Sequence, residues 1–504
     1  MKRSKSAKPR KKEGMFDLSL EKFPYPDVRN VVYAIGTNRE MGFQCGFQLA
    51  EYLSHYAKIF WSKCSAFESK DKIVKRLREH IGVIEKLAPE ILDFTRGVAQ
   101  GASGAGLNMR HEDVLITIWH WNLIPPILGA CSSFGAWGGA TENGEPIFAQ
   151  NLDDLFYPTF YDSIIVYFPK GGNSFAMMGF PGVGGNNGMN AKGLVVSTQW
   201  NPTRDEDRSR GWQETLVVYW LLQNAGSVEE AKELIEEIPV AEARNYVLMD
   251  GGQACVVEAT PSKKLVRRPG ENGEKDFIVT TNHFNSKGWE GRYDIPNSPE
   301  HFNFNSWTRY MTIFKKVEEN HGSINPDIAS EIMSSHEYWN GKGWVKAGAK
   351  CNRTPCVIDL DREGEIYCTG SHQVFMPRHR EFRFVQGPPC GGLSPVFLGA
   401  KGYVKIAFEK SPSGMNELMK KDAAKLIVGA SELVCKGLEG EMRQKIEGAL
   451  KHYVEGKNAE LTAGDSGALF SLACLSRAAS RFARAQAYAR YAILKARISP
   501  EQLL

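Results

Sequence analysis

The chain has 504 residues, of which 42% are hydrophobic and 24% charged, the composition of an ordinary soluble globular protein with material for two or three domains. The net charge of +4 is local: seven basic residues and no acidic residue lie within positions 1–12, and the rest of the chain has 55 basic against 58 acidic residues. This balance argues against a nucleic-acid partner, which would need a broadly basic surface. We expect residues 1–15 to form a basic, disordered tail, with a weak anchor to anionic surfaces as the less favoured alternative.

The sequence also argues against secretion and membrane insertion. No apolar segment of the signal-peptide type follows the basic start, because residues 16–24 include four polar or charged side chains. The most membrane-like run, residues 114–130, contains a histidine, an asparagine and two prolines and is too short to span a bilayer. Ten cysteines without a disulfide-framework spacing fit a reducing compartment. The sequence therefore predicts a cytoplasmic protein with no stable membrane insertion.

Residues 16–130 are predicted to be mainly helical. Apolar residues recur at helical spacing over residues 39–56 and 73–96, and the second stretch is broken near Ala88 and Pro89. The glycine-rich residues 97–106 are predicted to form a loop, and residues 112–121 a further short helix.

From Cys131 onward the pattern changes to short alternating or β-branched runs separated by Gly, Asn, Asp and Pro. Helices are predicted for residues 212–224 and 228–238, and strands for residues 164–168, 194–198, 246–249, 255–258, 277–281, 356–360 and 366–368. The last two strands are expected to form a hairpin with a solvated tip at residues 361–364. Strands in blocks, with helices in blocks between them, predict a layered α+β fold rather than a βαβ repeat.

The segment beyond residue 396 is predicted to be a helical extension. A stripe of residues on one helical face runs from Leu472 to Ile493, and it is expected to be core or domain-packing surface rather than a partner site. The predicted organisation is thus a tail at 1–15, a helical segment at 16–130, a mixed sandwich at 131–395 and a helical extension at 396–504.

The chemistry is expected to centre on Cys131. Because Ala130 is small, the Cys131 thiol could attack the Ala130 carbonyl, and an N-to-S shift followed by hydrolysis would free Cys131 as a new N-terminus. Its α-amine, with an ordinary pKa of about 7.7–8.0, could then serve as the base for its own thiol, so that no histidine is required. Taken alone, a cysteine after alanine is more often a small buried apolar residue.

Three further residues strengthen the case for Cys131. Asp153 follows 22 positions later at the end of a predicted strand and could orient the ammonium or thiol. Asn245 opens another strand and could donate its amide to an oxyanion, and Arg309 could clamp a carboxylate or orient Asp153. The glycine-rich residues 182–194 allow close backbone approach to a substrate but lack the ending of a phosphate-binding loop. Singly, each of these is more often a turn or surface residue.

In combination, these segments resemble the penicillin acyltransferase-like (isopenicillin N acyltransferase) family of N-terminal-nucleophile cysteine hydrolases, which is related to the choloylglycine hydrolases. The similarity covers roughly residues 35–375, and each segment is weak alone, whereas the order of all eight is specific. The segments are residues 36–42 (GTNREMG), 89–101 (PEILDFTRGVAQG), the Cys131 site, 150–153 (QNLD), 188–194 (GMNAKGL), 244–246 (RNY), 281–284 (TNHF) and 306–309 (SWTR).

The resemblance implies a four-layer αββα sandwich of the N-terminal-nucleophile type, preceded by a helical pro-segment. It implies cleavage between Ala130 and Cys131 into an α/β heterodimer, with homo-oligomer formation left open, and no cofactor and no metal. The implied catalytic residues are Cys131 as nucleophile, Asp153 as its polar partner, Asn245 in the oxyanion hole and Arg309. Gln199 or Trp200 would supply a second backbone donor, and Asn190 would help to bind the substrate.

Two departures from the family pattern narrow the expectation. Many relatives have glycine before the cysteine, where this chain has Ala130, so cleavage is expected to be slower. The choloylglycine branch tends to have arginine where this chain has Gln150, and it differs again at Asp154. The chain is therefore expected to follow the acyltransferase-like branch rather than to hydrolyse bile salts.

Competing interpretations of single residues remain open. His283 could pair with Cys131, but a strand-end hydrogen-bonding role is favoured if the α-amine is the base. A zinc site built from Cys351, Cys356, Cys368 and His372 is disfavoured by their spacing. A set of aromatic residues could either line an apolar acyl pocket or belong to the ordinary core: Phe134, Trp137, Phe156, Tyr157 and Trp200.

Two functions follow from the sequence. The favoured one is an enzyme that attacks an N-acyl or peptide-like amide of a small-molecule substrate through a thioester at Cys131 and passes the acyl group to water or an amine. The alternative is a non-catalytic binding or assembly module on the same fold, with the C-terminal helices as its interface.

Overall fold

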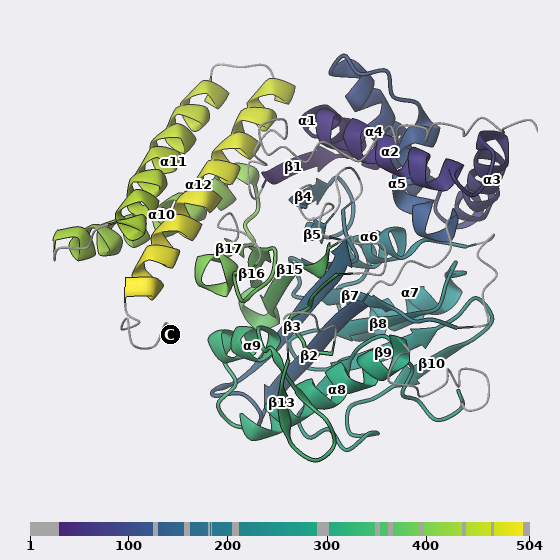
Figure 1. The fold of residues 1–504 in the computed structure, drawn as a ribbon. Coiled ribbons are helices and arrows are strands. Elements are labelled where there is room, and N and C mark those ends of the chain that lie inside the picture. Colours follow the sequence, from purple (N-terminus) through teal and green to yellow (C-terminus); the bar gives the residue numbers. More distant parts are fainter. Residues whose placement is uncertain are drawn as a thin grey trace, which may run out of the picture.

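The computed structural model describes residues 30–123, 130–155, 162–179, 182, 184–203, 211–289, 302–347, 353–360, 366–392, 398–435, 440–464 and 468–496 (Figure 1). At the centre lie an eight-stranded and a seven-stranded sheet, and helices cover their outer faces. The mixed class of helices and sheets predicted from the sequence is confirmed.

The eight-stranded sheet is antiparallel except where its edge strand β1 pairs in parallel with β4. In spatial order its strands are β1 (Asn30–Gly36), β4 (Ser163–Pro169), β5 (Phe175–Gly179), β6 (Asn187–Asn190), β7 (Val195–Trp200), β8 (Arg244–Met249), β9 (Ala254–Ala259) and β10 (Lys264–Arg267). Side chains alternate between its faces: Val32 and Ala34 of β1 pack under helices, whereas Val31 and Tyr33 face the interior between the sheets.

The seven-stranded sheet is antiparallel throughout, with β14 (Ile358–Leu360) paired to β15 beside the main path. That path is β11 (Phe277–Thr280), β2 (Ala130–Gly138), β3 (Gly144–Leu155), β15 (Ile366–Met376), β16 (Glu381–Gln386) and β17 (Val404–Ala407). The predicted pairing of 356–360 with 366–368 is confirmed by the register of Ile358 opposite Cys368. A separate small sheet joins β12 (Glu337–Trp339) and β13 (Trp344–Lys346).

Two groups of helices cover the outer faces of the sheets. The eight-stranded sheet shares a core with α1 (Asn38–Gln48), α2 (Ala50–Ser65), α3 (Lys70–Leu87), α4 (Pro89–Gly104), α5 (His111–Leu123), α6 (Glu214–Asn224) and α7 (Val228–Glu237). The seven-stranded sheet is covered by α8 (Phe302–Glu319) and α9 (Pro326–Met333). Between the sheets, apolar residues such as Val166 and Phe148 meet, and the Gln199 amide donates to Ser133 Oγ over 3.1 Å.

The prediction of a loop at residues 97–106 is wrong, because α4 continues to Gly104. The glycines serve a close crossing of α4 over α1. A Cβ on Gly97 would lie 2.3 Å from the carbonyl oxygen of Arg39, and one on Gly101 would lie 1.9 Å from that of Phe43. The contact is reciprocal, since a Cβ on Gly46 of α1 would lie 2.0 Å from the Val98 carbonyl oxygen. The absence of side chains, rather than backbone freedom, explains these glycines.

The C-terminal part contains α10 (Pro412–Cys435), α11 (Glu441–Gly464) and α12 (Ala468–Ala496). The packing role predicted for the stripe on α12 is confirmed, because its residues Leu472, Ala479 and Phe482 share a buried apolar cluster with strand residues of both sheets. Val31 and Tyr33 of β1 donate their backbone N–H groups to the hydroxyls of Ser480 and Ser476, over 2.8 and 2.9 Å. Gln486 accepts from the backbone N–H of Lys405 in β17, so α12 bonds to the outer edges of both sheets (Figure 1).

Two strands of the central sheets lie outside residues 131–395, the range predicted for the sandwich. Strand β1, within the predicted helical segment, belongs to the eight-stranded sheet, and β17, beyond residue 395, belongs to the seven-stranded one. Among the helices of the described ranges, none combines the length and apolar character required to cross a bilayer. The basic tail and the hairpin tip at 361–364 lie outside the described residues.

Candidate active site

Cys131 is the second residue of β2, in the sheet position opposite Leu152 of β3. Only 4% of its surface is exposed. Its backbone N–H donates to Asn282 Oδ1 over 2.9 Å, while the N–H of Ala130 donates to the Tyr367 hydroxyl. Both amides that flank the Ala130 carbonyl are therefore held by side chains from distant parts of the chain.

Arg309 is a fully buried guanidinium on α8 that binds the backbone of Cys131. Its Nη1 donates to the Cys131 carbonyl oxygen over 2.6 Å and to Ser132 Oγ over 2.8 Å. Its Nη2 donates to Asn282 Oδ1 over 2.7 Å, so Asn282 accepts from both Arg309 and Cys131. Two planar donors of one guanidinium thus fix the Cys131 carbonyl relative to the Asn282 amide.

Asp153 lies opposite Ala130 in the β2–β3 register. Its Oδ1 accepts from the Thr369 hydroxyl over 2.6 Å, and within the described residues its buried Oδ2 has no hydrogen-bond partner. Burial raises the pKa of Asp153 to about 7, against the attraction of the Arg309 charge and the Thr369 hydrogen bond. The carboxyl is therefore poised to gain or lose a proton near neutral pH.

The Cys131 thiol is a weak acid in the continuous chain. Burial and then the Asp153 charge raise its pKa to about 12, while Arg244, the Asp153 backbone N–H and Arg309 oppose the rise. The thiol thus interacts directly with both the charge and the backbone of Asp153. At neutral pH it needs a base before it can act as a nucleophile.

Asn245, Gln199 and Trp200 meet at the ends of β7 and β8, where Gln199 pairs with Asn245. The Asn245 Nδ2 donates to the carbonyl oxygens of Thr281 and His283, each over 3.0 Å, and the Trp200 carbonyl accepts from Asn282 Nδ2 over 2.6 Å. Asn282 therefore links this region to Cys131. The oxyanion role of Asn245 stays a prediction, and it requires that Nδ2 give up one of its carbonyl partners.

A buried charged cluster lies behind this region. Arg244, the neighbour of Asn245, contacts Glu214 of α6 over 2.9 Å and Glu242 over 2.5 Å, and all three are at most 6% exposed. Burial and the nearby Glu242 raise the pKa of Glu214, while Arg244 opposes the shift. Because Arg244 also lowers the pKa of Cys131, its charge reaches the candidate site.

Asn190 has all of its amide hydrogen-bonding capacity engaged away from Cys131. Its Nδ2 donates to the carbonyls of Leu222 and Ala225, and its Oδ1 accepts from the backbone N–H groups of Lys192 and Leu194. The amide joins the β6–β7 turn to the end of α6. A substrate-binding role for Asn190 stays a prediction without a free donor to support it.

His283 is held by hydroxyl groups: its Nδ1 lies 2.7 Å from Ser306 Oγ and 3.2 Å from Thr281 Oγ1. Burial lowers the pKa of His283 to about 3, so the ring is neutral at physiological pH. These contacts match the hydrogen-bonding role favoured for it. Among the aromatics, Phe134 belongs to the core under α8. Phe156 and Tyr157 lie outside the described residues.

Three residues of the site were not predicted as site residues from the sequence. Asn282 lies in residues 281–284 (TNHF), one of the eight segments that carry the resemblance, but nothing in the sequence assigned it a role in the site. Tyr367 and Thr369 had no signal, because they reach Asp153 only through the pairing of β15 with β3, more than 200 residues along the chain.

Comparison with known proteins agrees with the predicted resemblance. The family model described as acyl-coenzyme A:6-aminopenicillanic acid acyl-transferase matches residues 140–337. This match confirms the resemblance inferred from the sequence. The matched residues include Asp153, Asn245, Asn282 and Arg309 and begin after Cys131.

Among curated proteins, an uncharacterized protein of Archaeoglobus fulgidus is 23% identical over 346 residues, which cover 59% of this chain and 56% of the relative. The chain thus spans just over half the length of that relative. A variant of conjugated bile acid hydrolase from Clostridium perfringens matches at 16% identity and a TM-score of 0.35, covering 51% of this chain and 89% of the other. Penicillin V acylase from Agrobacterium tumefaciens matches at 16% identity and a TM-score of 0.32, covering 55% and 86%.

Proposed function

We propose that this protein is a self-processing cysteine amidohydrolase or acyltransferase, an αββα enzyme of the N-terminal-nucleophile type that cleaves its chain between Ala130 and Cys131. The proposal rests on two hydrogen bonds to the Cys131 backbone. Its N–H donates to Asn282, and its carbonyl oxygen accepts from Arg309. Buried backbone groups always need partners, but β11 pairs with β2 only from Ser133 onward, so at Cys131 a buried amide and a buried guanidinium take the place of a neighbouring strand. After cleavage the same nitrogen would be an α-amine held by Asn282 beside its own thiol.

In the proposed cleavage, Asp153 takes the proton of the Cys131 thiol. The sulfur attacks the Ala130 carbonyl carbon, the carbon–nitrogen bond breaks, and the proton passes to the departing nitrogen. This leaves a thioester between Ala130 and the Cys131 sulfur, together with a free α-amine. Water then hydrolyses the thioester, which yields the Ala130 carboxylate and restores the thiol. A carboxyl group with a pKa of about 7 suits both proton transfers.

In the proposed reaction on a substrate, the α-amine of Cys131 accepts the thiol proton and the sulfur attacks an acyl amide. The negative charge on the substrate oxygen would be stabilised by the Asn245 amide and a backbone N–H near Gln199 or Trp200. The leaving amine takes the proton, and water or a second amine removes the acyl group from sulfur. The family model, whose description names acyl transfer from a coenzyme A thioester, supports an acyl-enzyme of this kind.

The decisive experiment is intact-mass measurement of the purified wild-type chain beside the Cys131→Ala variant. We expect two fragments split between Ala130 and Cys131 in the wild type and one uncut chain in the variant. Cys255→Ser, which alters a buried cysteine of β9 outside the site, serves as the matched control and should be cut like the wild type. A wild-type chain that is active and uncut would disprove self-processing.

A second measurement addresses the substrate class. Cleaved protein is incubated with a panel of N-acyl amino acids and acyl thioesters, and the acylated peptide that contains Cys131 is sought by mass spectrometry. Acylation of Cys131 by at least one donor is expected. Cleaved protein that accepts none of the donors would disprove the proposed chemistry and favour the binding-module alternative.

A further inference from the structure

A second group of reactive side chains lies apart from Cys131, where three loops converge. His336 follows α9, Cys356 precedes β14, and Cys390 lies in the turn after β16. One nitrogen of His336 and the two sulfur atoms all lie within 4.8 Å of one another, and the sulfurs are 3.5 Å apart. The sequence does not predict this group, because its members are 20 and 34 residues apart, unlike the closely spaced cysteines and histidines of known metal-binding motifs.

We propose that His336, Cys356 and Cys390 form a binding site for Zn²⁺ or a similar thiolate-preferring divalent cation, with a fourth position open to another ligand. Two thiolates and an imidazole are ligands that zinc prefers, at about 2.3 Å to sulfur and 2.0–2.1 Å to nitrogen. Two sulfurs on a tetrahedral zinc lie about 3.8 Å apart. The observed separation of 3.5 Å therefore needs only a small adjustment.

Backbone hydrogen bonds already hold the two cysteines of the proposed site. The backbone N–H of Gly392 donates to the Cys390 sulfur over 3.3 Å, and a ring nitrogen of His336 lies within 4.8 Å of the same sulfur. The backbone N–H of Cys356 donates to the carbonyl oxygen of Ser335, the residue before His336, over 3.3 Å. Such outer contacts orient metal ligands and stabilise negative charge on sulfur.

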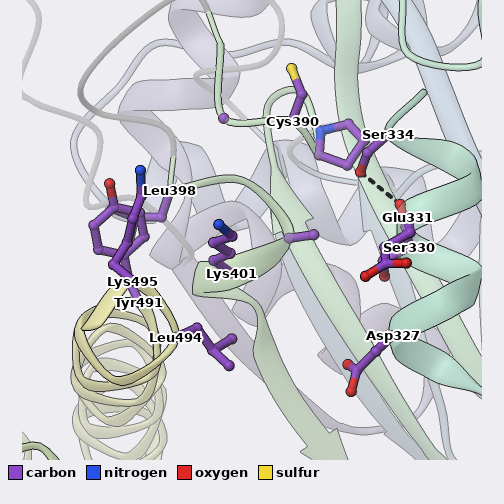
Figure 2. A pocket seen from close by; sticks show the side chains of 13 residues that line it. Asp327, Ser330, Glu331, Ser334, Cys390, Leu398, Lys401, Tyr491, Leu494 and Lys495 are labelled. Atoms are coloured by element: carbon purple, nitrogen blue, oxygen red, sulfur yellow. Dashed lines mark hydrogen bonds between the residues drawn. The ribbon is translucent and has the colours of Figure 1, made fainter. Parts of the chain in front are cut away.

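A cation could reach the group from the surface. Cys356 is buried, whereas Cys390 is exposed and lies at the rim of a pocket between α9 and the end of α12, with Ser334 on one side and Tyr491 on the other (Figure 2). The ligand set differs from the zinc set disfavoured from the sequence. His372 of that set binds Ser330 and Asn151, and Cys351 lies outside the described residues.

The proposed site is connected to the candidate active site by the backbone next to Cys356. The N–H of Val357 donates to the Thr369 hydroxyl over 2.9 Å, and that hydroxyl donates to Asp153. The Thr369 N–H returns a hydrogen bond to the Val357 carbonyl over 2.9 Å. A cation at Cys356 would therefore brace the segment that holds Asp153, although its binding does not depend on the proposed enzyme activity.

The test measures zinc content by plasma mass spectrometry on the full chain, purified without chelators from zinc-supplemented cells. We expect one zinc per wild-type chain and less than a tenth of that in Cys390→Ser and in His336→Ala. Two variants should keep their zinc: Cys474→Ser, a buried cysteine on α12, and Cys131→Ala, which separates this site from the candidate nucleophile. Equal zinc in all variants, or none in the wild type, would overturn the proposal.

Cobalt substitution supplies a second readout, which reports whether sulfur atoms bind the metal. The cobalt-loaded wild type should absorb through thiolate-to-metal charge transfer from two sulfurs, and Cys390→Ser should lose most of that absorption. Peptide mapping distinguishes the main competing outcome. A Cys356–Cys390 disulfide in freshly purified wild-type protein, with no bound metal, would replace the metal site by a redox pair.

Discussion

At the scale of single residues, Asp153 couples stability to pH. Its pKa lies near 7 when folded and at 3.8 in the unfolded reference, because burial penalises the charged form. Between these values the folded chain keeps a proton that the unfolded chain releases, so stability falls as pH rises through this window. The loss is complete above pH 7 and absent below 3.8. At about 1.4 kcal/mol per unit it amounts to about 4 kcal/mol.

Replacing Asp153 by asparagine should remove this pH dependence while keeping an acceptor for Thr369. In a Cys131→Ala background, which keeps the chain uncut, the fall in Tm between pH 4.5 and pH 7.5 should be smaller with Asp153→Asn than without it. Calorimetry at a series of pH values checks this. An unchanged fall would mean that another group carries the effect. In the native background, Asp153→Asn should also slow self-cleavage, measured on denaturing gels.

Arg309 holds the Cys131 carbonyl, Ser132 and Asn282 through two nitrogens of one plane. Arg309→Lys keeps a positive charge but offers one nitrogen, so at least one hydrogen bond to Cys131 or Asn282 is lost. At about 1.5–3 kcal/mol for a charged hydrogen bond, self-cleavage should slow on the order of 10- to 100-fold. A gel time course after synthesis measures it. Arg443→Lys, at an exposed pair with Glu447, is the control and should cut at the normal rate.

The sequence predicted those site residues whose side-chain type alone indicates a chemical role. Cys131, Asp153 and Arg309 stand out because a thiol, a carboxylate and a guanidinium in this order have few structural uses together. Tyr367 could not be foreseen, because its place beside Ala130 depends on strand pairing across 237 positions. Nor could Asn282 be distinguished from Asn245, since both amides come from strand ends and only the fold assigns one to Cys131.

At the scale of elements, the crossing of α1 and α4 depends on missing side chains. Gly97→Ala and Gly101→Ala would place a methyl group 2.3 and 1.9 Å from backbone oxygens of α1, so the helices must separate. Each change should destabilise the protein by about 1–3 kcal/mol or more. Gly82→Ala in α3 is the matched control, because its methyl group meets nothing within 4 Å and alanine favours a helix by up to about 1 kcal/mol. Tm values of the three variants test the contrast.

Helices and strands could be predicted where apolar residues recurred at regular spacing over a long segment, or where turn residues clearly marked the ends of that segment. The break at Ala88 and the strand predicted at 246–249, which in the structure begins at Arg244, followed from local pattern and turn chemistry. Strand β1 was missed because its short apolar run is equally compatible with a buried helix, and only pairing with β4 decides. The loop predicted at 97–106 failed because glycine marks both turns and close helix contacts, which composition alone does not distinguish.

At the scale of the whole molecule, the proposed cleavage would leave two pieces that share their cores. The piece before Cys131 contributes β1 to the eight-stranded sheet and α1–α5 to the core over it. We therefore expect the two fragments to separate on a denaturing gel and to migrate as one species in native mass spectrometry. The uncut Cys131→Ala chain gives the reference mass for the native complex. Fragments that separate without denaturant would show that this shared core is too weak to hold them.

The bonds between α12 and β1 have a consequence for synthesis on the ribosome. The edge amides of β1 at Val31 and Tyr33 are covered by serine hydroxyls that lie 449 and 443 positions later in the chain. At about 5–20 residues per second, this cover arrives on the order of 20 to 90 s after the strand has been made. Gln44 and Gln48 of α1 already bind the Ile35 amide and the Tyr33 and Ile35 carbonyls, but until α12 is made the amides of Val31 and Tyr33 lack their serine partners. Unpaired amides on a strand edge are a recognised route to aggregation. Covering these two amides therefore requires translation through Ser480 of α12, however early the two sheets fold.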